Sequence, residues 1–155
     1  MKRRLSLVLA FVATVMTASA WADEPSVQQI AESRAAEWNA AFARGKVDDI
    51  LSLYTENAIL LQPNGSVSKN LREIREFWQV LIQKGVYAMD IVTARCGDDN
   101  TIITTATLSD VKTLQNPSHE TMKYRYNGVL YSVFKRQADG TWKAKVQQWS
   151  GSNPI

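Results

Sequence analysis

Cysteine and histidine are almost absent from this sequence, which has one of each in 155 residues. Because Cys96 is the only cysteine, no disulfide can form within the chain and no C-x-x-C metal or redox motif exists. His119 lies among polar residues, which is typical of a solvated loop. No group of His, Asp and Glu has the spacing of metal ligands. The sequence therefore predicts no metal site and no cofactor.

Long apolar runs are also missing. The run over residues 5–17 is too short for a membrane span, which takes about 20 residues. It follows Lys2, Arg3 and Arg4, and it leads into two A-x-A patterns that end at Ala20 and Ala22. This order is typical of a cleaved secretory signal peptide.

The signal peptide sets the expected domain limits and location. We expect a signal peptide over residues 1–22 and a single domain over residues 23–155, in a periplasmic or secreted protein without a membrane span. Of the 18 basic residues, three are lost with the signal peptide, so fifteen remain against 15 acidic residues. Without a basic excess, nucleic acid is not an expected partner.

The first half of the predicted domain has apolar residues at helical spacing. This pattern predicts a helix over residues 26–44, and Arg34 lies on its apolar stripe, one turn from both Ile30 and Trp38. Such a side chain either runs along apolar surface to reach water or binds a ligand inside the protein. Both interpretations stay open at this stage.

Two more helices and a strand follow. Asp48 is expected to cap a short helix that includes Tyr54, and residues 58–62 are expected to form a strand. Asn70, with Glu73 three residues later, resembles a capping box that opens a third helix.

Residues 86–96, 101–113, 122–136 and 141–149 have alternating patterns that predict four long antiparallel strands. Helices followed by such strands predict an α+β domain with its helices on one face of a sheet. Apolar residues occupy both faces, so a second copy of the chain is the expected cover for the outer face. The residues expected on this outer, dimer-forming face are Val129, Tyr131, Val133, Trp142, Ala144 and Val146.

Several short motifs run through residues 26–155 in a characteristic order. None is specific alone, but their order and spacing are specific together. They are Trp38…Ala41…Gly45, Ile50-x-x-Leu53-Tyr54, Asn57-Ala58, Gln62-Pro63-Asn64-Gly65, Ile74-Arg75-Glu76-Phe77-Trp78, Phe134-Lys135-Arg136, Asp139-Gly140-x-Trp142-Lys143 and Trp149-Ser150.

With these motifs the chain resembles the nuclear transport factor 2-like superfamily, and within it the SnoaL-like, ketosteroid isomerase-homologue proteins. The resemblance implies a cystatin-like cone, in which three N-terminal helices pack on a curved antiparallel sheet around a pocket. It also implies a dimer through the convex face of the sheet.

The resemblance allows the isomerase positions to be compared with this sequence. The oxyanion-binding Tyr corresponds to Trp38, the catalytic base to Gln62, and the protonated Asp to Ser132. Because an amide such as that of Gln62 cannot accept a proton as a base does, steroid isomerisation is not expected. No catalytic residue is predicted.

Other enzymes of the superfamily fit no better. Scytalone-type dehydratases need two histidines, and His119 is alone. Limonene-type epoxide hydrolases need two carboxylates bridged by an arginine, and nothing places Asp90 or Asp110 beside Arg34. SnoaL-type cyclases use an acidic residue in the pocket, and this chain has Gln147 where several relatives carry Asp.

The predicted site is therefore a pocket with polar but mostly uncharged side chains. The resemblance and the strand alternation place these side chains inward, and Arg34 joins them from the first helix. Core packing of the tryptophans and ordinary satisfied amides are the simpler alternatives. The expected ligand-binding residues are Arg34, Trp38, Gln62, Trp78, Ser132, Gln147 and Trp149.

Two functions remain in consideration. The first is an exported binding or accessory protein that holds a small, mostly apolar molecule. The alternative is an isomerase, dehydratase or polyketide cyclase-type enzyme that acts on a small hydrophobic carbonyl compound. Because the known catalytic residues are missing, the first function is favoured.

The signal peptide gives a direct prediction. Expression in a bacterium with a periplasm should yield a mature chain that begins after Ala20 or Ala22, because peptidase cleaves after A-x-A. Intact-mass measurement of the periplasmic fraction checks this result. A mature protein that still carries Met1 through Ala18 would contradict it.

Overall fold

The computed structural model describes residues 24–113 and 121–151. The expected signal peptide over residues 1–22 and the expected loop residue His119 lie outside the described residues. The helices are α1 (Val27–Ala43), α2 (Val47–Leu51) and α3 (Leu71–Lys84). The strands are β1 (Tyr54–Leu61), β2 (Val67–Ser68), β3 (Val86–Asp98), β4 (Thr101–Thr113), β5 (Thr121–Arg136) and β6 (Trp142–Ser150).

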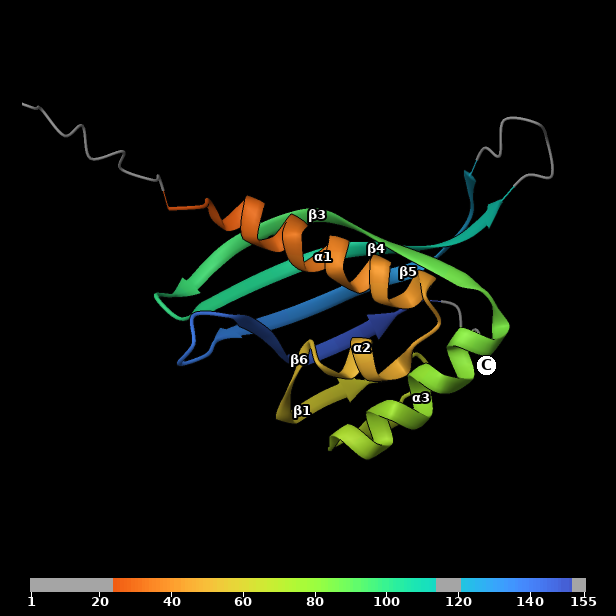
Figure 1. The fold of residues 1–155 in the computed structure, drawn as a ribbon, viewed down its shortest axis with the longest axis horizontal. Helices are drawn as coiled ribbons and strands as arrows, with labels where there is room; N and C mark the ends of the chain where they lie inside the picture. The colour runs from red at the N-terminus through yellow and green to blue at the C-terminus, as the bar shows by residue number, and fades with distance from the viewer. Residues whose placement is uncertain (1–23, 114–120, 152–155) are drawn as a thin grey trace, which may run out of the picture.

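The strands form one curved sheet in the order β2-β1-β6-β5-β4-β3, and the helices lie on its concave face (Figure 1). The predicted α+β class and cone are confirmed. The sheet is mixed, because β1 pairs in parallel with β6 while the other pairings are antiparallel. Within the described residues, no helix has the length and apolar character needed to cross a membrane.

The helix starts follow from side-chain caps. Ser26 and Gln29 form a capping box at α1, and the Asn70 side chain accepts from the backbone N–H of Glu73 at 3.0 Å at α3. The expected cap of α2 by Asp48 is wrong, because the N-cap position is Lys46, which makes no side-chain cap. The Asp48 carboxylate instead pairs with Arg75 of α3 at 2.5 Å.

Helix α1 is tied to the edge strand β3 by a single amide side chain. Asn39 Nδ2 donates to the Met89 carbonyl oxygen at 2.9 Å, and Asn39 Oδ1 accepts from the Met89 N–H at 2.7 Å. Among the described strands, none lies beside β3 on that side, so these two bonds satisfy backbone groups that would otherwise lack a strand partner. They also fix the position of α1 along the sheet.

A β-bulge in β6 changes which of its side chains face inward. Val133 pairs with Val146 while Phe134 pairs with Ala144, so Lys145 is an extra residue in the strand. Beyond the bulge the alternation shifts, and Gln147 joins Ala144 on the buried face. The expectation that Trp142 and Ala144 lie with Val146 on the outer face is therefore wrong.

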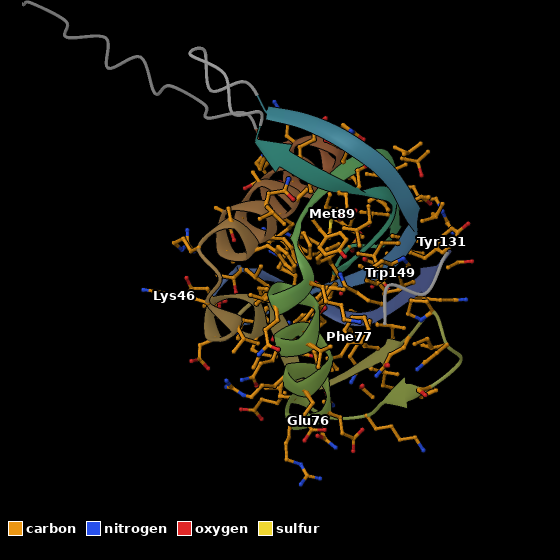
Figure 2. The ribbon with its side chains drawn as sticks, turned by 90° about the vertical axis from the view of Figure 1, so that its right-hand side faces the viewer. Lys46, Glu76, Phe77, Met89, Tyr131 and Trp149 are labelled. Carbon is orange, nitrogen blue, oxygen red and sulfur yellow. The ribbon has the colours of Figure 1, made fainter. Side chains whose placement is uncertain are left out.

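The space between helices and sheet is filled mainly by aromatic rings. Phe77, Met89 and Trp149 point into this space, whereas Tyr131 points away from the opposite face (Figure 2). Trp78 stacks on Trp149 with their ring centroids 6.4 Å apart. The buried aromatic residues of this core are Trp38, Phe42, Tyr54, Phe77, Trp78, Tyr87, Phe134 and Trp149.

Candidate functional site

A buried chain of hydrogen bonds crosses the centre of the cone. Trp78 Nε1 donates to the Tyr54 hydroxyl at 2.8 Å, and that hydroxyl donates to Gln147 Oε1. Gln147 Nε2 in turn donates to Ser132 Oγ at 3.0 Å. The chain joins α3, β1, β6 and β5, and all four side chains are buried.

Burial raises the pKa of Tyr54 far above its usual range, and this exceeds the opposing effect of the hydrogen bond from Trp78. Desolvation disfavours the phenolate, so the hydroxyl stays protonated at neutral pH. The Tyr54 hydroxyl thus donates a hydrogen bond to Gln147 Oε1, and it does not act as a base. Sequence reasoning missed this residue because it placed Tyr54 in a helix. A buried tyrosine needs a partner for its hydroxyl, but the sequence does not name that partner.

The predicted pocket is reduced to a void of about 10 Å³ beside this chain. Such a volume holds about one water-sized atom. Buried aromatic and aliphatic side chains fill the rest of the cone. The void is lined by Arg34, Trp38, Leu53, Tyr54, Met89, Phe134, Ala144 and Gln147.

Trp38 carries an unusual polar atom. Its side chain is 3% exposed, and it stacks on Phe42 with the ring centroids 4.8 Å apart. Trp38 Nε1 is buried and has no hydrogen-bond partner among the described residues. Buried donors are nearly always paired, so this N–H is a candidate contact for a ligand.

Arg34 connects the void with a larger cleft of about 740 Å³. Its guanidinium pairs with Glu37 and donates to the Trp142 carbonyl oxygen at 3.4 Å. The side chain is 20% exposed, so it neither lies in the core nor extends freely into water. Arg34 is thus positioned at the boundary between the protein interior and the cleft.

The cleft lies between the start of α1 and the turns that join β3 to β4 and β5 to β6. Ile30, Ile102 and Trp142 give it apolar walls. Four carboxylates line it, those of Glu24, Asp98, Asp99 and Asp139. A hydrogen bond from the Thr101 side chain holds the pKa of Asp98 below its usual range, and hydrogen bonds from Thr141 do the same for Asp139.

The predicted site residues separate into those that line the void, those joined to it by hydrogen bonds, and those that lie elsewhere. Arg34, Trp38 and Gln147 line the void, and Ser132 and Trp78 are joined to it through the hydrogen-bond chain. Trp149 packs in the aromatic core against Phe77 and Trp78 and does not line the void.

Gln62 lies apart from the other predicted residues. It follows the end of β1, where its backbone N–H donates to the Ser66 carbonyl oxygen at 2.8 Å. Its side chain is half-buried, and Gln62 Nε2 donates to Oγ of the buried Ser68 at 2.9 Å. It borders a separate groove with Glu76 and Phe77. Gln62 therefore does not line the void with Arg34, Trp38 and Gln147.

The cleft itself could not be found from the sequence. Its walls come from α1, β4 and the residues around β6, which are far apart along the chain. No three His, Cys, Asp or Glu side chains in the described part of the chain are grouped to hold a metal ion.

Comparison with known proteins identifies the family. A family model described as SnoaL-like domain matches residues 35–144. No curated protein gives a sequence match. Solved structures with this nuclear transport factor 2-like (cystatin-like) fold match across most of the chain.

Three of these structures illustrate the likeness. A domain of unknown function with a cystatin-like fold from Nostoc punctiforme is 15% identical, covers 81% of this chain and 77% of its own, and has a TM-score of 0.64. A ketosteroid isomerase-like protein from Erwinia carotovora is 15% identical, covers 81% and 95%, and has a TM-score of 0.61. An NTF-2 like protein of unknown function from Shewanella oneidensis is 16% identical, covers 79% and 98%, and has a TM-score of 0.62. At these identities the likeness shows the fold alone.

The hydrogen-bond chain gives a stability prediction. Tyr54→Phe removes the hydroxyl but keeps the ring, so Trp78 Nε1 and Gln147 Oε1 each lose their partner. The free energy of unfolding should fall by about 1–3 kcal/mol, the cost of unpaired buried groups. Urea titration of the mature protein measures this change. Gln79→Ala, at an exposed position on α3, is the control and should stay within about 0.5 kcal/mol. Equal stability of the two variants would contradict the prediction.

Proposed function

We propose that this chain, which belongs to the SnoaL-like domain family, is an exported protein that binds a small, mostly apolar molecule. The proposed site is the cleft at the start of α1, with the void beneath Arg34 as its inner end. Residues 1–22 support a periplasmic or secreted location through their signal-peptide pattern.

The position of Arg34 is the observation that carries this proposal. Ligand sites are typically clefts of about 300–1,000 Å³ with apolar walls and a few polar groups, and a cleft of about 740 Å³ fits that range. The guanidinium of Arg34 borders the cleft, where it can bind a carbonyl or carboxylate oxygen. Its present partner Glu37 is 45% exposed, so water already competes for that carboxylate.

The interior chemistry favours binding over catalysis. General acid–base catalysis needs a group that exchanges a proton near the working pH. The hydroxyls and amides around the void, including Ser132, Gln147 and the protonated Tyr54, do not titrate there. The alternative of an isomerase, dehydratase or cyclase therefore has no proton acceptor among the residues that line the void.

We also propose a homodimer through the outer face of the sheet. Val129, Val133 and Val146 are only partly buried there, and Tyr131 is 47% exposed. The register places Tyr131 opposite Gln148, and Val133 opposite Val146, so these residues form one continuous patch. Apolar side chains in such a patch are stabilised when a second copy covers them.

The cleft gives a binding prediction. The probe is 1-anilinonaphthalene-8-sulfonate, an apolar anion whose fluorescence rises in apolar sites. Arg34→Ala should weaken its binding by about 1.5–3 kcal/mol, the scale of a hydrogen bond to a charged group. Arg44 pairs with Asp49 and does not line the cleft. Arg44→Ala also removes one arginine, and it should leave binding of the probe unchanged. If both variants bind equally well, or if the native protein does not bind the probe, the proposed function is wrong.

The outer face gives an assembly prediction. Light scattering at micromolar concentration should give the mass of a dimer for the mature chain. Tyr131→Asp should shift it toward the monomer, because a buried unpaired charge opposes association. Gln79→Asp adds the same charge at an exposed site on α3 and should leave the dimer intact. A monomeric native protein would refute the dimer.

A further inference from the structure

We infer that the void beneath Arg34 receives one oxygen atom of the ligand, and that the site therefore selects a carboxylate with an apolar body. This inference rests on the proposed function and names the ligand class for it. Its basis is the pairing of two donors, Arg34 and Trp38, at the inner end of the cleft.

The indole of Trp38 supplies the first constraint. An indole N–H only donates a hydrogen bond, so its partner is an acceptor and never an ammonium group. Trp38 Nε1 is buried and has no partner in the described parts of the chain, and Trp38 lines the void. An acceptor oxygen in the void would pair this donor, and a buried unpaired donor otherwise carries a free-energy cost.

The size of the void supplies the second constraint. At about 10 Å³ it admits a single atom of oxygen size and excludes the body of a ligand. The apolar body must then stay in the cleft, along the walls formed by Ile30, Ile102 and Trp142.

The position of Arg34 allows one ligand to satisfy both constraints. Arg34 and Trp38 are four residues apart on α1, so their side chains lie on the same face of the helix. Arg34 borders both the cleft and the void. A carboxylate beside it has two oxygens, one for the guanidinium and one for the void, and so engages both donors. An amide carbonyl oxygen can accept from both donors, but it carries no charge, so its bond to the guanidinium is weaker than that of a carboxylate. An ammonium group accepts from neither donor.

Three ligands with the same eight-carbon chain test the inference by isothermal titration calorimetry. The mature protein should bind octanoate at least tenfold more tightly than octanamide, and octylamine should not bind at the site. Trp38→Phe keeps an aromatic ring next to Phe42 but removes the N–H, and it should weaken octanoate binding about 10- to 100-fold. Phe77→Leu is the control, because Phe77 packs in the same aromatic core but does not line the void.

A measurement on the native protein avoids any folding defect of the variants. Octanoate should move the indole N–H resonance of Trp38 downfield in the nitrogen–proton spectrum, since that proton gains a hydrogen bond. Octylamine should leave the resonance in place. The indole signal of Trp78 should move less than that of Trp38.

The outcomes separate this inference from the proposed function. If octanoate binds but the Trp38 resonance does not move and Trp38→Phe binds equally well, the void holds only solvent and the inference is overturned. The proposed function then still stands on the Arg34 dependence of the sulfonate probe. If neither octanoate nor the sulfonate probe binds the native protein, both are overturned.

Discussion

The hydrogen bond between Tyr54 and Gln147 is the interaction on which the centre of this protein depends. It joins β1 to β6, and Trp78 and Ser132 extend it to α3 and β5. Because each of these groups is buried, each must be paired or carry a free-energy cost. The pairing therefore permits only one arrangement of helix and sheet, and the surrounding aromatic rings pack against that arrangement.

Because buried side chains fill the cone, the larger accessible space is the cleft outside the core. Trp38, Trp78 and Trp149 occupy the volume in which the resemblance implied a pocket, and a void of about 10 Å³ remains. The larger cleft lies at the start of α1 and is lined there by the turns that join β3 to β4 and β5 to β6. Arg34 is the one charged side chain that borders both spaces among the described residues. The same packing that stabilises the core thus places a cation at the inner end of the cleft.

Two local irregularities determine which side chains take part. The bulge at Lys145 turns Gln147 and Ala144 to the same inner face. The tight turn after β1 pairs the Gln62 side chain with the buried Ser68 and not with the residues around the void. Strict alternation along the strands predicts neither change, since alternation holds only while the register is unbroken.

The sequence alone determined the order of the three helices and the five longer strands, the α+β class and the family, but it did not predict the short β2. Helical spacing, caps such as Asn70 and alternating strands are local patterns, and local patterns are readable because they depend on neighbouring residues. It also identified Arg34 as a cation on an apolar stripe. Only the tertiary structure decided that Tyr54 lies at the centre of the hydrogen-bond chain and that Gln62 lies outside the cluster. The tertiary structure also decided that Trp38 Nε1 has no hydrogen-bond partner among the described residues. These outcomes depend on contacts between residues far apart in the chain, where one extra residue in a strand changes which groups meet.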